Sequence, residues 1–248
     1  MPWAWDAATG ILHANIGFFL RDHILKPKNT LPPVIAIDGP AASGKGTVAR
    51  SLARELGFHL LLSGSLYRLL AWLAREKQVS SDDEEALACL TRGISPQNGE
   101  GFVCEGRVIP EESLQEEGIG TLASQVARHP KVREALLGLQ RACRKPPGLV
   151  AEGRDMGTVV FANAPLKVFL TASAEERARR RFLQLNMPLD HDRLAKLAEE
   201  IKQRDALDAG RLSAPMRASE DAWIIDTTSL LADEVVAIIA RRARQLCF

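Results

Sequence analysis

The sequence lacks the usual marks of a metalloprotein, a disulfide-rich protein and a membrane protein. Its four cysteines form no Cys-x-x-Cys pair and have no histidine cluster beside them, so we expect free thiols in a reducing compartment. No stretch reaches the roughly 18 consecutive apolar residues that a membrane-spanning helix needs. The formal net charge is +1, which provides no global attraction to nucleic acid or to an anionic membrane. We therefore expect a cytoplasmic protein that binds neither nucleic acid nor membranes, with a monomer as the default.

The N-terminal segment lacks a targeting signal. Asp6 is the one charge before the apolar stretch 11–20, whereas a secretory signal begins with basic residues, and no small-residue cleavage site follows. Nothing in the sequence assigns this segment a role. We treat residues 1–30 as an N-terminal extension of unknown role.

Beyond this extension, short apolar runs alternate with helical patterns. Hydrophobic residues make up 46% of the 248-residue chain, enough to bury a sizeable core. Such alternation is typical of a parallel sheet with helices on both faces. The sequence therefore predicts an α/β fold with a five-stranded parallel sheet, its strands at 33–38, 58–63, 148–152, 166–171 and 222–226. The expected helices span 45–57, 64–77, 131–144, 174–185, 190–207 and 230–246.

The segment from 80 to 125 breaks this alternation. The turn-rich stretch ISPQNGEGF is followed by the short alternating pieces FVCEG and RVIP. Short alternating pieces between turns favour antiparallel strands. We expect a small antiparallel insertion between the second and third strands of the core.

The stretch IAIDGPAASGKGTVAR, residues 35–50, has the pattern of a phosphate-binding loop. Gly39, Gly44 and Lys45 have the required spacing. Glycines let successive backbone N–H groups point at an anion, and the following helix adds the positive end of its dipole. The residue after the lysine is a glycine, and the hydroxyl comes one position later, at Thr47. We expect a nucleoside triphosphate to be held by Gly39, Ala42, Ser43, Gly44, Lys45, Gly46 and Thr47.

The loop alone leaves the reaction open. A glycine-rich turn without a ligand is the plain alternative, and such loops serve kinases, GTPases, ATPase motors and passive binders. The sequence has no Asn-Lys-x-Asp string to read guanine, and no Asp-Glu pair directly follows an apolar strand, as it does in ATPase motors. The groups after the strand at 148–152 are Glu152, Arg154 and Asp155, which suit acceptor binding better than water activation.

Several longer strings make the sequence resemble the bacterial cytidylate kinases, which are nucleoside monophosphate kinases. These strings are IDGPAASGKGT, LLSGSLYR (61–68), ASQVARHPKVREALL (123–137), GLVAEGRDMGTVVF (148–161) and IKQRDALDAGR (201–211). The resemblance implies phosphoryl transfer from ATP, with Mg²⁺, to CMP or dCMP. It also implies a five-stranded parallel core, a CMP-binding insertion and a short mobile lid. The expected kinase domain, 31–248, then divides into a core (31–79 and 146–248), an insertion (about 80–145) and a lid (about 182–192).

CMP offers a phosphate and a ribose, and the resemblance assigns residues to both. Arg68, Arg204 and Arg211 are implied to hold the phosphate, because a guanidinium forms a planar fork for its oxygens. Asp208 is implied to contact the ribose. By spacing alone, Arg204, Asp208 and Arg211 share one helical stripe, which a surface salt bridge explains equally well.

CMP also offers a cytosine edge. Its exocyclic amine is a hydrogen-bond donor and favours a carboxylate partner, whereas uracil has an acceptor at that position. Asp155 resembles the family's cytosine-contacting acid, and Ser124 and Arg133 resemble its other base contacts. The alternatives are a helix cap for Asp155 and a buried helical hydroxyl for Ser124. Arg154 is assigned to the base or the phosphate, and Ser63 to the border of CMP. We expect CMP to be preferred over UMP.

The donor side has an arginine cluster in the string ERARRR. Arg177, Arg180 and Arg181 resemble lid arginines, with Arg177 and Arg180 implied to bind ATP. The alternative is a solvated helix face. No protein ligand is singled out for Mg²⁺. The residues expected to be catalytic are Lys45, Arg181, Arg204 and Arg211.

Two positions depart from the family pattern. Leu62 stands where an aspartate is expected beside the serine, and Gln115 stands where an arginine is frequent. Both bear on substrate preference, and neither removes a core catalytic group. Two alternative functions stay open: another small-molecule kinase, for UMP or shikimate, and a nucleotide-binding regulator without catalytic activity.

Overall fold

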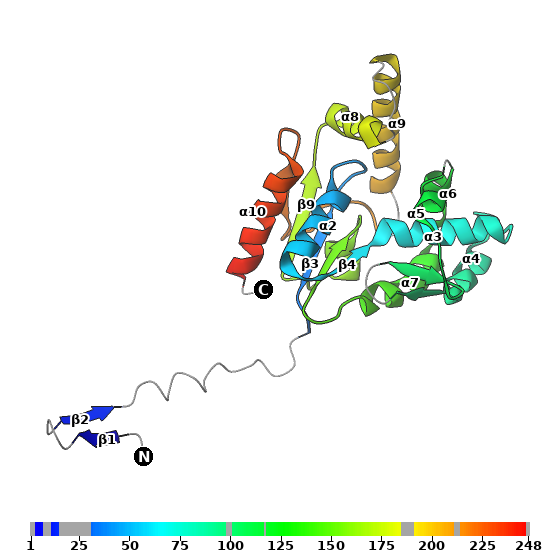
Figure 1. The fold of residues 1–248 in the computed structure, drawn as a ribbon. Coiled ribbons are helices and arrows are strands. Elements are labelled where there is room, and N and C mark those ends of the chain that lie inside the picture. Colours follow the sequence, from blue (N-terminus) through cyan, green and yellow to red (C-terminus); the bar gives the residue numbers. More distant parts are fainter. Residues whose placement is uncertain are drawn as a thin grey trace. The chain divides into compact units, whose positions relative to one another are not determined.

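The computed structural model describes residues 3–6, 11–14, 31–97, 101–116, 118–184, 191–210 and 214–246. The chain divides into two compact units, residues 1–31 and 32–248. In the first unit, strands β1 (Trp3–Asp6) and β2 (Ile11–Ala14) pair as an antiparallel hairpin (Figure 1). The sequence patterns did not predict this hairpin.

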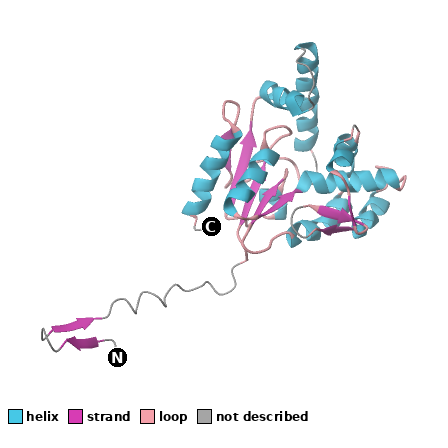
Figure 2. Cartoon of the chain, viewed as in Figure 1, coloured by secondary structure: helices cyan, strands magenta, loops and turns pink. Residues whose placement is uncertain are grey.

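The second unit is built on a five-stranded sheet in the order β10-β9-β3-β8-β4. All neighbouring strands are parallel, which confirms the predicted fold class. Figure 2 shows these strands gathered at the centre of the unit, with helices around them. The strands are β3 (Val34–Asp38), β4 (His59–Leu62), β8 (Leu149–Glu152), β9 (Leu166–Thr171) and β10 (Trp223–Asp226).

Alternate residues of the central strand β3 point to opposite faces of the sheet. Both faces are apolar, and helical segments cover each of them. Ile35 and Ile37 pack in one apolar cluster with residues of α2 and α10. Val34 and Ala36 pack in another with the π-helical turn η2 (Met156–Val160). All four strand side chains are fully buried, and each large one contributes about 1.5–3 kcal/mol. The core helices are α2 (Lys45–Leu56), α3 (Ser63–Glu76), α8 (Ala174–Gln184), α9 (His191–Ala209) and α10 (Ala232–Gln245).

The segment between β4 and β8 contains the antiparallel strands expected there. Strands β5, β6 and β7 form a three-stranded antiparallel sheet. A separate apolar cluster joins this segment to α3, including Leu70 of α3, Cys104 of β6 and Leu136 of α7. Its elements are α4 (Glu84–Leu90), η1 (Thr91–Gly93), β5 (Ile94–Pro96), β6 (Phe102–Cys104), β7 (Arg107–Val108), α5 (Glu111–Gln115), α6 (Ile119–Val126) and α7 (Pro130–Ala142).

Helices α8 and α9 pack against each other through Ala178, Ala198 and Ile201. Most of the expected lid, residues 185–190, lies outside the described residues. Within the described part of the chain, no helix is both long enough and apolar enough to cross a bilayer.

Candidate active site

The glycine loop follows the last residue of β3 and leads into α2. Gly39 has φ 145°, and a Cβ on this residue would lie 2.0 Å from the carbonyl oxygen of Leu170 in β9. Gly44 has φ 87° and precedes Lys45, the first residue of α2. Both glycines are therefore required, one by a close approach to a neighbouring strand and one by a left-handed backbone. The loop lies at the carboxyl ends of the parallel strands, where ligands bind in open α/β sheets.

Lys45 is held inside this loop. Its Nζ donates to the carbonyl oxygen of Pro40 at 2.6 Å and lies 3.6 Å from a carboxylate oxygen of Glu152. Burial, followed by the positive charge of Arg154, lowers the pKa of Lys45 from 10.5 to about 7. Glu152 opposes this shift. The lysine is therefore a buried cation at a position where further negative charge would stabilise its protonated form.

Two of the predicted lid arginines reach the glycine loop from α8. Arg177 donates to the carbonyl oxygen of Ala41 at 3.2 Å, and Arg180 lies 3.4 Å from that of Ser43. Arg180 also donates to the backbone of Thr227 at 2.5 Å. The structure thus brings Arg177 and Arg180 to the loop, against the alternative of a solvated helix face for this pair.

Arg177 is held on three sides, and Arg181 lies farther along the same helix. Arg177 is 6% exposed, forms an ion pair with Asp205 of α9 and donates to the carbonyl oxygen of Ala172. Arg181 is half-buried on α8. The described contacts place Arg177 as a link between α8, α9 and the loop.

Arg154 connects the loop region to α9. Its Nη1 lies 3.9 Å from Glu152, and its Nε lies 3.3 Å from a carboxylate oxygen of Asp208, which is 2% exposed. Charges of alternating sign therefore run from Lys45 through Glu152 and Arg154 to Asp208. Arg204 belongs to α9, but its side chain lies outside the described residues, as does Arg211 altogether.

The buried Asp155 forms a second ion pair, with the partly buried Arg133. The Asp155 side chain makes no capping hydrogen bond to η2, so the alternative of a helix cap is wrong. The guanidinium of Arg133 also lies 5.7 Å from the ring centre of Tyr67, within the range of a cation–π contact. Two of the three residues predicted to contact the base therefore lie together.

Three other predicted acceptor residues lie between β4 and β8, in α3 and α6. Ser63 accepts a hydrogen bond from Gln140 at 3.0 Å, and Arg68 donates to the carbonyl oxygen of Leu114 at 2.9 Å. The hydroxyl of Ser124 donates to the carbonyl oxygen of Gly120 in its own helix at 3.2 Å, which agrees with the alternative of a helical hydroxyl. All three contacts are made within the segment between β4 and β8.

Sequence reasoning missed Asp38 and Asp205. Asp38 ends β3 directly before Gly39, and its carboxylate accepts hydrogen bonds from the backbone N–H groups of Met156 and Gly157. An acidic residue at the end of a buried strand was the available signal. Asp205 gave no signal, because an acid in a charged helix is usually solvated and here pairs with Arg177 instead.

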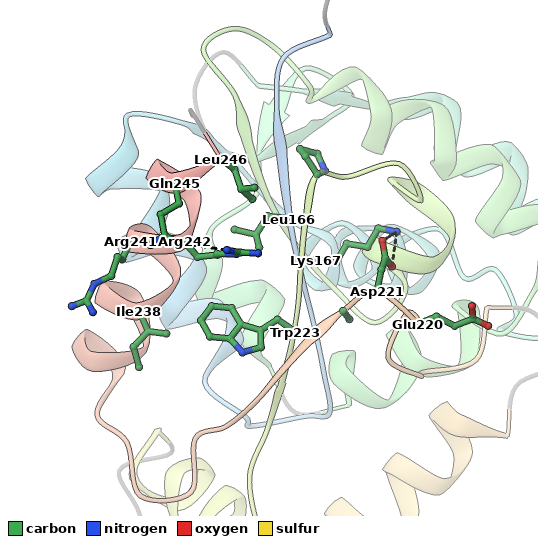
Figure 3. Close-up of a pocket in the computed structure, with 12 residues that line it drawn as sticks. Leu166, Lys167, Glu220, Asp221, Trp223, Ile238, Arg241, Arg242, Gln245 and Leu246 are labelled. Atoms are coloured by element: carbon green, nitrogen blue, oxygen red, sulfur yellow. Dashed lines mark hydrogen bonds and ion pairs between the residues drawn. The ribbon is translucent and has the colours of Figure 1, made fainter.

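A cavity of about 680 Å³ lies at the opposite end of the sheet, where β9 and β10 begin, and Figure 3 shows the residues that line it. Leu166 and Trp223, the first residues of β9 and β10, line it together with the C-terminal half of α10. None of the predicted site residues lines it. The candidate active site is therefore assigned from the glycine loop and the charged contacts, not from this cavity.

Comparison with known proteins identifies the family. The cytidylate kinase family model matches residues 35–245. A cytidylate kinase of Stutzerimonas stutzeri is 53% identical over 210 residues, which cover 82% of this chain and 92% of that protein. A cytidylate kinase of Pseudomonas paraeruginosa is 49% identical over 225 residues (88% and 97%), and one of Proteus mirabilis is 47% identical over 220 residues (87% and 97%). The chain belongs to the cytidylate kinase family.

Proposed function

We propose that this chain transfers a phosphoryl group from ATP to CMP or dCMP, with the glycine loop as donor site and the turn after β8 as acceptor site. The single observation that carries this assignment is the row of charges from Lys45 through Glu152 and Arg154 to Asp208. This row runs from the phosphate-binding loop to the helix that carries the predicted acceptor residues. Donor and acceptor residues thus lie on one continuous set of contacts.

On the donor side, the chain supplies positive charge and backbone donors. Transfer passes through a loose transition state, so catalysis is mainly alignment and neutralisation of phosphate charge. The backbone N–H groups of the loop bind the donor phosphates, and Lys45 leaves Pro40 to contact them. Arg177 and Arg180 hold the loop through the carbonyl groups of Ala41 and Ser43. We propose Arg181 as the lid residue that approaches the transferred group.

On the acceptor side, a dianionic phosphate attacks without a general base. Arg154 is next to Asp208, so the guanidinium holds the CMP phosphate while the carboxylate binds the ribose. We propose that Arg68, Arg204 and Arg211 complete the phosphate site.

The cytosine edge is assigned to the buried pair. Asp155 accepts from the exocyclic amine, and Arg133 donates to the ring acceptors of the base. We propose Ser63 and Ser124 at the border of this site. A site of this kind rejects UMP because buried polar groups would be left unpaired.

We propose that the donor binds with Mg²⁺. Within the described residues, no group of three or more His, Cys, Asp or Glu side chains gathers to hold a metal, and Mg²⁺ on a nucleotide needs none, since it keeps waters and takes one or two protein oxygens plus phosphates. Thr47 offers an exposed hydroxyl in the first turn of α2, and Glu152 offers a carboxylate beside Lys45. Mg²⁺ there would neutralise charge on the donor phosphates.

A coupled assay of ADP formation tests the proposal. The purified chain is given ATP and Mg²⁺ with CMP, dCMP, UMP, AMP or shikimate in turn. We expect turnover with CMP and dCMP well above that with the others. Turnover with UMP or shikimate instead would support another small-molecule kinase, and ATP binding without CMP-dependent ADP formation would support a regulator.

A further inference from the structure

Asp38 joins the glycine loop to the acceptor turn directly. It is the last residue of β3 and the residue before Gly39, and it is 5% exposed. One carboxylate oxygen accepts from the N–H of Met156 at 2.8 Å, and the other accepts from the N–H of Gly157 at 2.7 Å. Both amides belong to η2, which directly follows Asp155. A single side chain therefore spans the donor loop and the segment that carries the acceptor residues.

The backbone around Asp38 is shaped for this contact. A Cβ on Gly157 would lie 3.3 Å from the Asp38 carboxylate and 3.3 Å from the side chain of Lys167, so glycine is what allows the amide to come so close. On the other side of the turn, the N–H of Gly153 donates to the carbonyl oxygen of Ile37 at 3.0 Å. The turn from 153 to 157 is thus attached to the end of β3 at both ends.

This turn orients two acceptor groups. Arg154 extends from it to Asp208, and Asp155 extends from it to Arg133. Each oxygen of Asp38 accepts one backbone amide and the residue is only 5% exposed, so its carboxylate is placed to hold the turn and not to contact substrate.

We infer that Asp38 is a positioning residue for phosphoryl transfer: its carboxylate fixes the Arg154–Asp155 turn against the glycine loop, so that CMP is held in line with the donor phosphate. The inference rests on the proposed function of the chain as a CMP kinase. One buried side chain, which contacts neither substrate, therefore aligns the donor site with the acceptor site.

The chemistry explains why a carboxylate is used. Burial raises the pKa of Asp38 from 3.8 to about 6, and the N–H groups of Gly157 and Met156 lower it in part. Asp155 raises the pKa further, and Lys45 lowers it. Burying a carboxylate is therefore costly, yet an amide side chain would turn an NH₂ group toward one of the two N–H donors. Two acceptors on one short side chain require the ionised acid.

The test compares Asp38→Asn with the control Asp83→Asn. Asp83 is also an aspartate that accepts a backbone N–H, from Ala86 at 3.0 Å, but it is exposed and caps α4. We expect Asp38→Asn to lower kcat with CMP about 100-fold, the loss typical of a misplacement of about 1 Å. The ratio of kcat/KM for CMP to that for UMP should fall about tenfold, while the Kd of ATP changes by less than about twofold. Asp83→Asn should keep all three values.

Further measurements separate this inference from the proposed function and from folding. If the wild-type chain phosphorylates no CMP, the proposed function fails; the inference is then judged by calorimetric binding, where Asp38→Asn must weaken CMP binding without weakening ATP binding. Hydrogen exchange at the amides of Met156 and Gly157 should be faster in the variant. A folded Asp38→Asn protein with wild-type kcat, CMP/UMP preference and exchange would overturn the inference.

A second variant covers the case in which Asp38→Asn does not fold. Gly157→Ala keeps the carboxylate but must push it from the amide by a few tenths of an ångström, and the backbone of Gly157 does not have a positive φ. We expect its kcat to fall about tenfold, a smaller loss than that from a misplacement of about 1 Å. Wild-type kcat in Gly157→Ala would contradict the inference.

Discussion

The ammonium of Lys45 lies 3.6 Å from the carboxylate of Glu152, and the two side chains are only 4% and 13% exposed. Because burial and Arg154 lower the pKa of Lys45 to about 7, the folded chain holds this proton less tightly than the unfolded chain does. Between pH 7 and 10.5 the folded state therefore binds fewer protons, and its stability relative to the unfolded state rises with pH in this window. The lysine is retained at a cost in stability.

Lys45→Met should separate catalysis from stability. We expect kcat to fall at least about 100-fold, because the change removes the positive charge proposed to stabilise the transferred phosphoryl group. The free energy of unfolding should not fall, and its rise with pH above 7 should be smaller than in the wild type. Denaturant unfolding at a series of pH values, with the exposed Lys131→Met as control, measures this. Curves that rise in parallel for wild type and Lys45→Met would contradict the assignment.

Asp155→Ala should weaken the choice of base. The change removes the proposed acceptor for the cytosine amine and leaves Arg133 without its buried partner, so discrimination against UMP should fall about 10- to 100-fold. The ratio of kcat/KM for CMP to that for UMP measures the effect. Asp221→Ala is the matched control, since Asp221 pairs with Lys167 at the far cavity. An unchanged ratio in Asp155→Ala would remove Asp155 from the base site.

Arg177 and Arg179 should differ sharply in their contribution to stability, although they lie two residues apart. Arg177→Ala leaves the partly buried Asp205 carboxylate without its charged partner, which should cost about 3–5 kcal/mol of unfolding free energy. Arg179 pairs with Glu176 at the surface, so Arg179→Ala should cost far less unfolding free energy.

Urea unfolding of the two variants measures the difference. Arg177→Lys should recover little, because a lysine cannot supply the separate donors that reach Ala41, Ala172 and Asp205. Equal losses in Arg177→Ala and Arg179→Ala would show that the buried pair is not the main contribution.

Local signals were enough to predict the sheet and the glycine loop. The strand 34–38 has four apolar residues followed by Asp38 and then Gly39, and Gly39, Gly44 and Lys45 all lie within seven consecutive residues. The alternation of strands and helices then gives a parallel sheet. These features are set by residues that are close together in the chain, so they can be recognised from the sequence alone.

Contacts between distant segments could not be predicted in the same way. Asp38 bonds to amides at Met156 and Gly157, and Arg177 bonds to the carbonyl group of Ala41. Backbone donors and acceptors have no sequence signature, so the partner appears only when the fold brings the segments together. For the same reason the hydroxyl of Ser124, which bonds within its own helix, looks identical in the sequence to one that contacts a base.

Removal of residues 1–30 should leave the enzyme intact. The family match begins at residue 35, and strands β1 and β2 pair with each other. We propose that the kinase domain begins at Leu31, so a chain starting there should keep its kcat and melting temperature. A chain starting at Val34 is the control: it loses the carbonyl groups of Pro32 and Pro33, which accept from Arg144 at 2.6 Å and from Leu149 at 2.9 Å.

The longer deletion should lower the free energy of unfolding by about 1.5–3 kcal/mol, because the Arg144 guanidinium would be left without its acceptor and the chain's new charged terminus would fall on a buried strand residue. Thermal melts and CMP-dependent ADP formation of the two truncated chains, beside the full chain, measure both effects. A tenfold loss of kcat on removing 1–30 alone would place this segment in the catalytic unit and move the domain boundary toward the N-terminus.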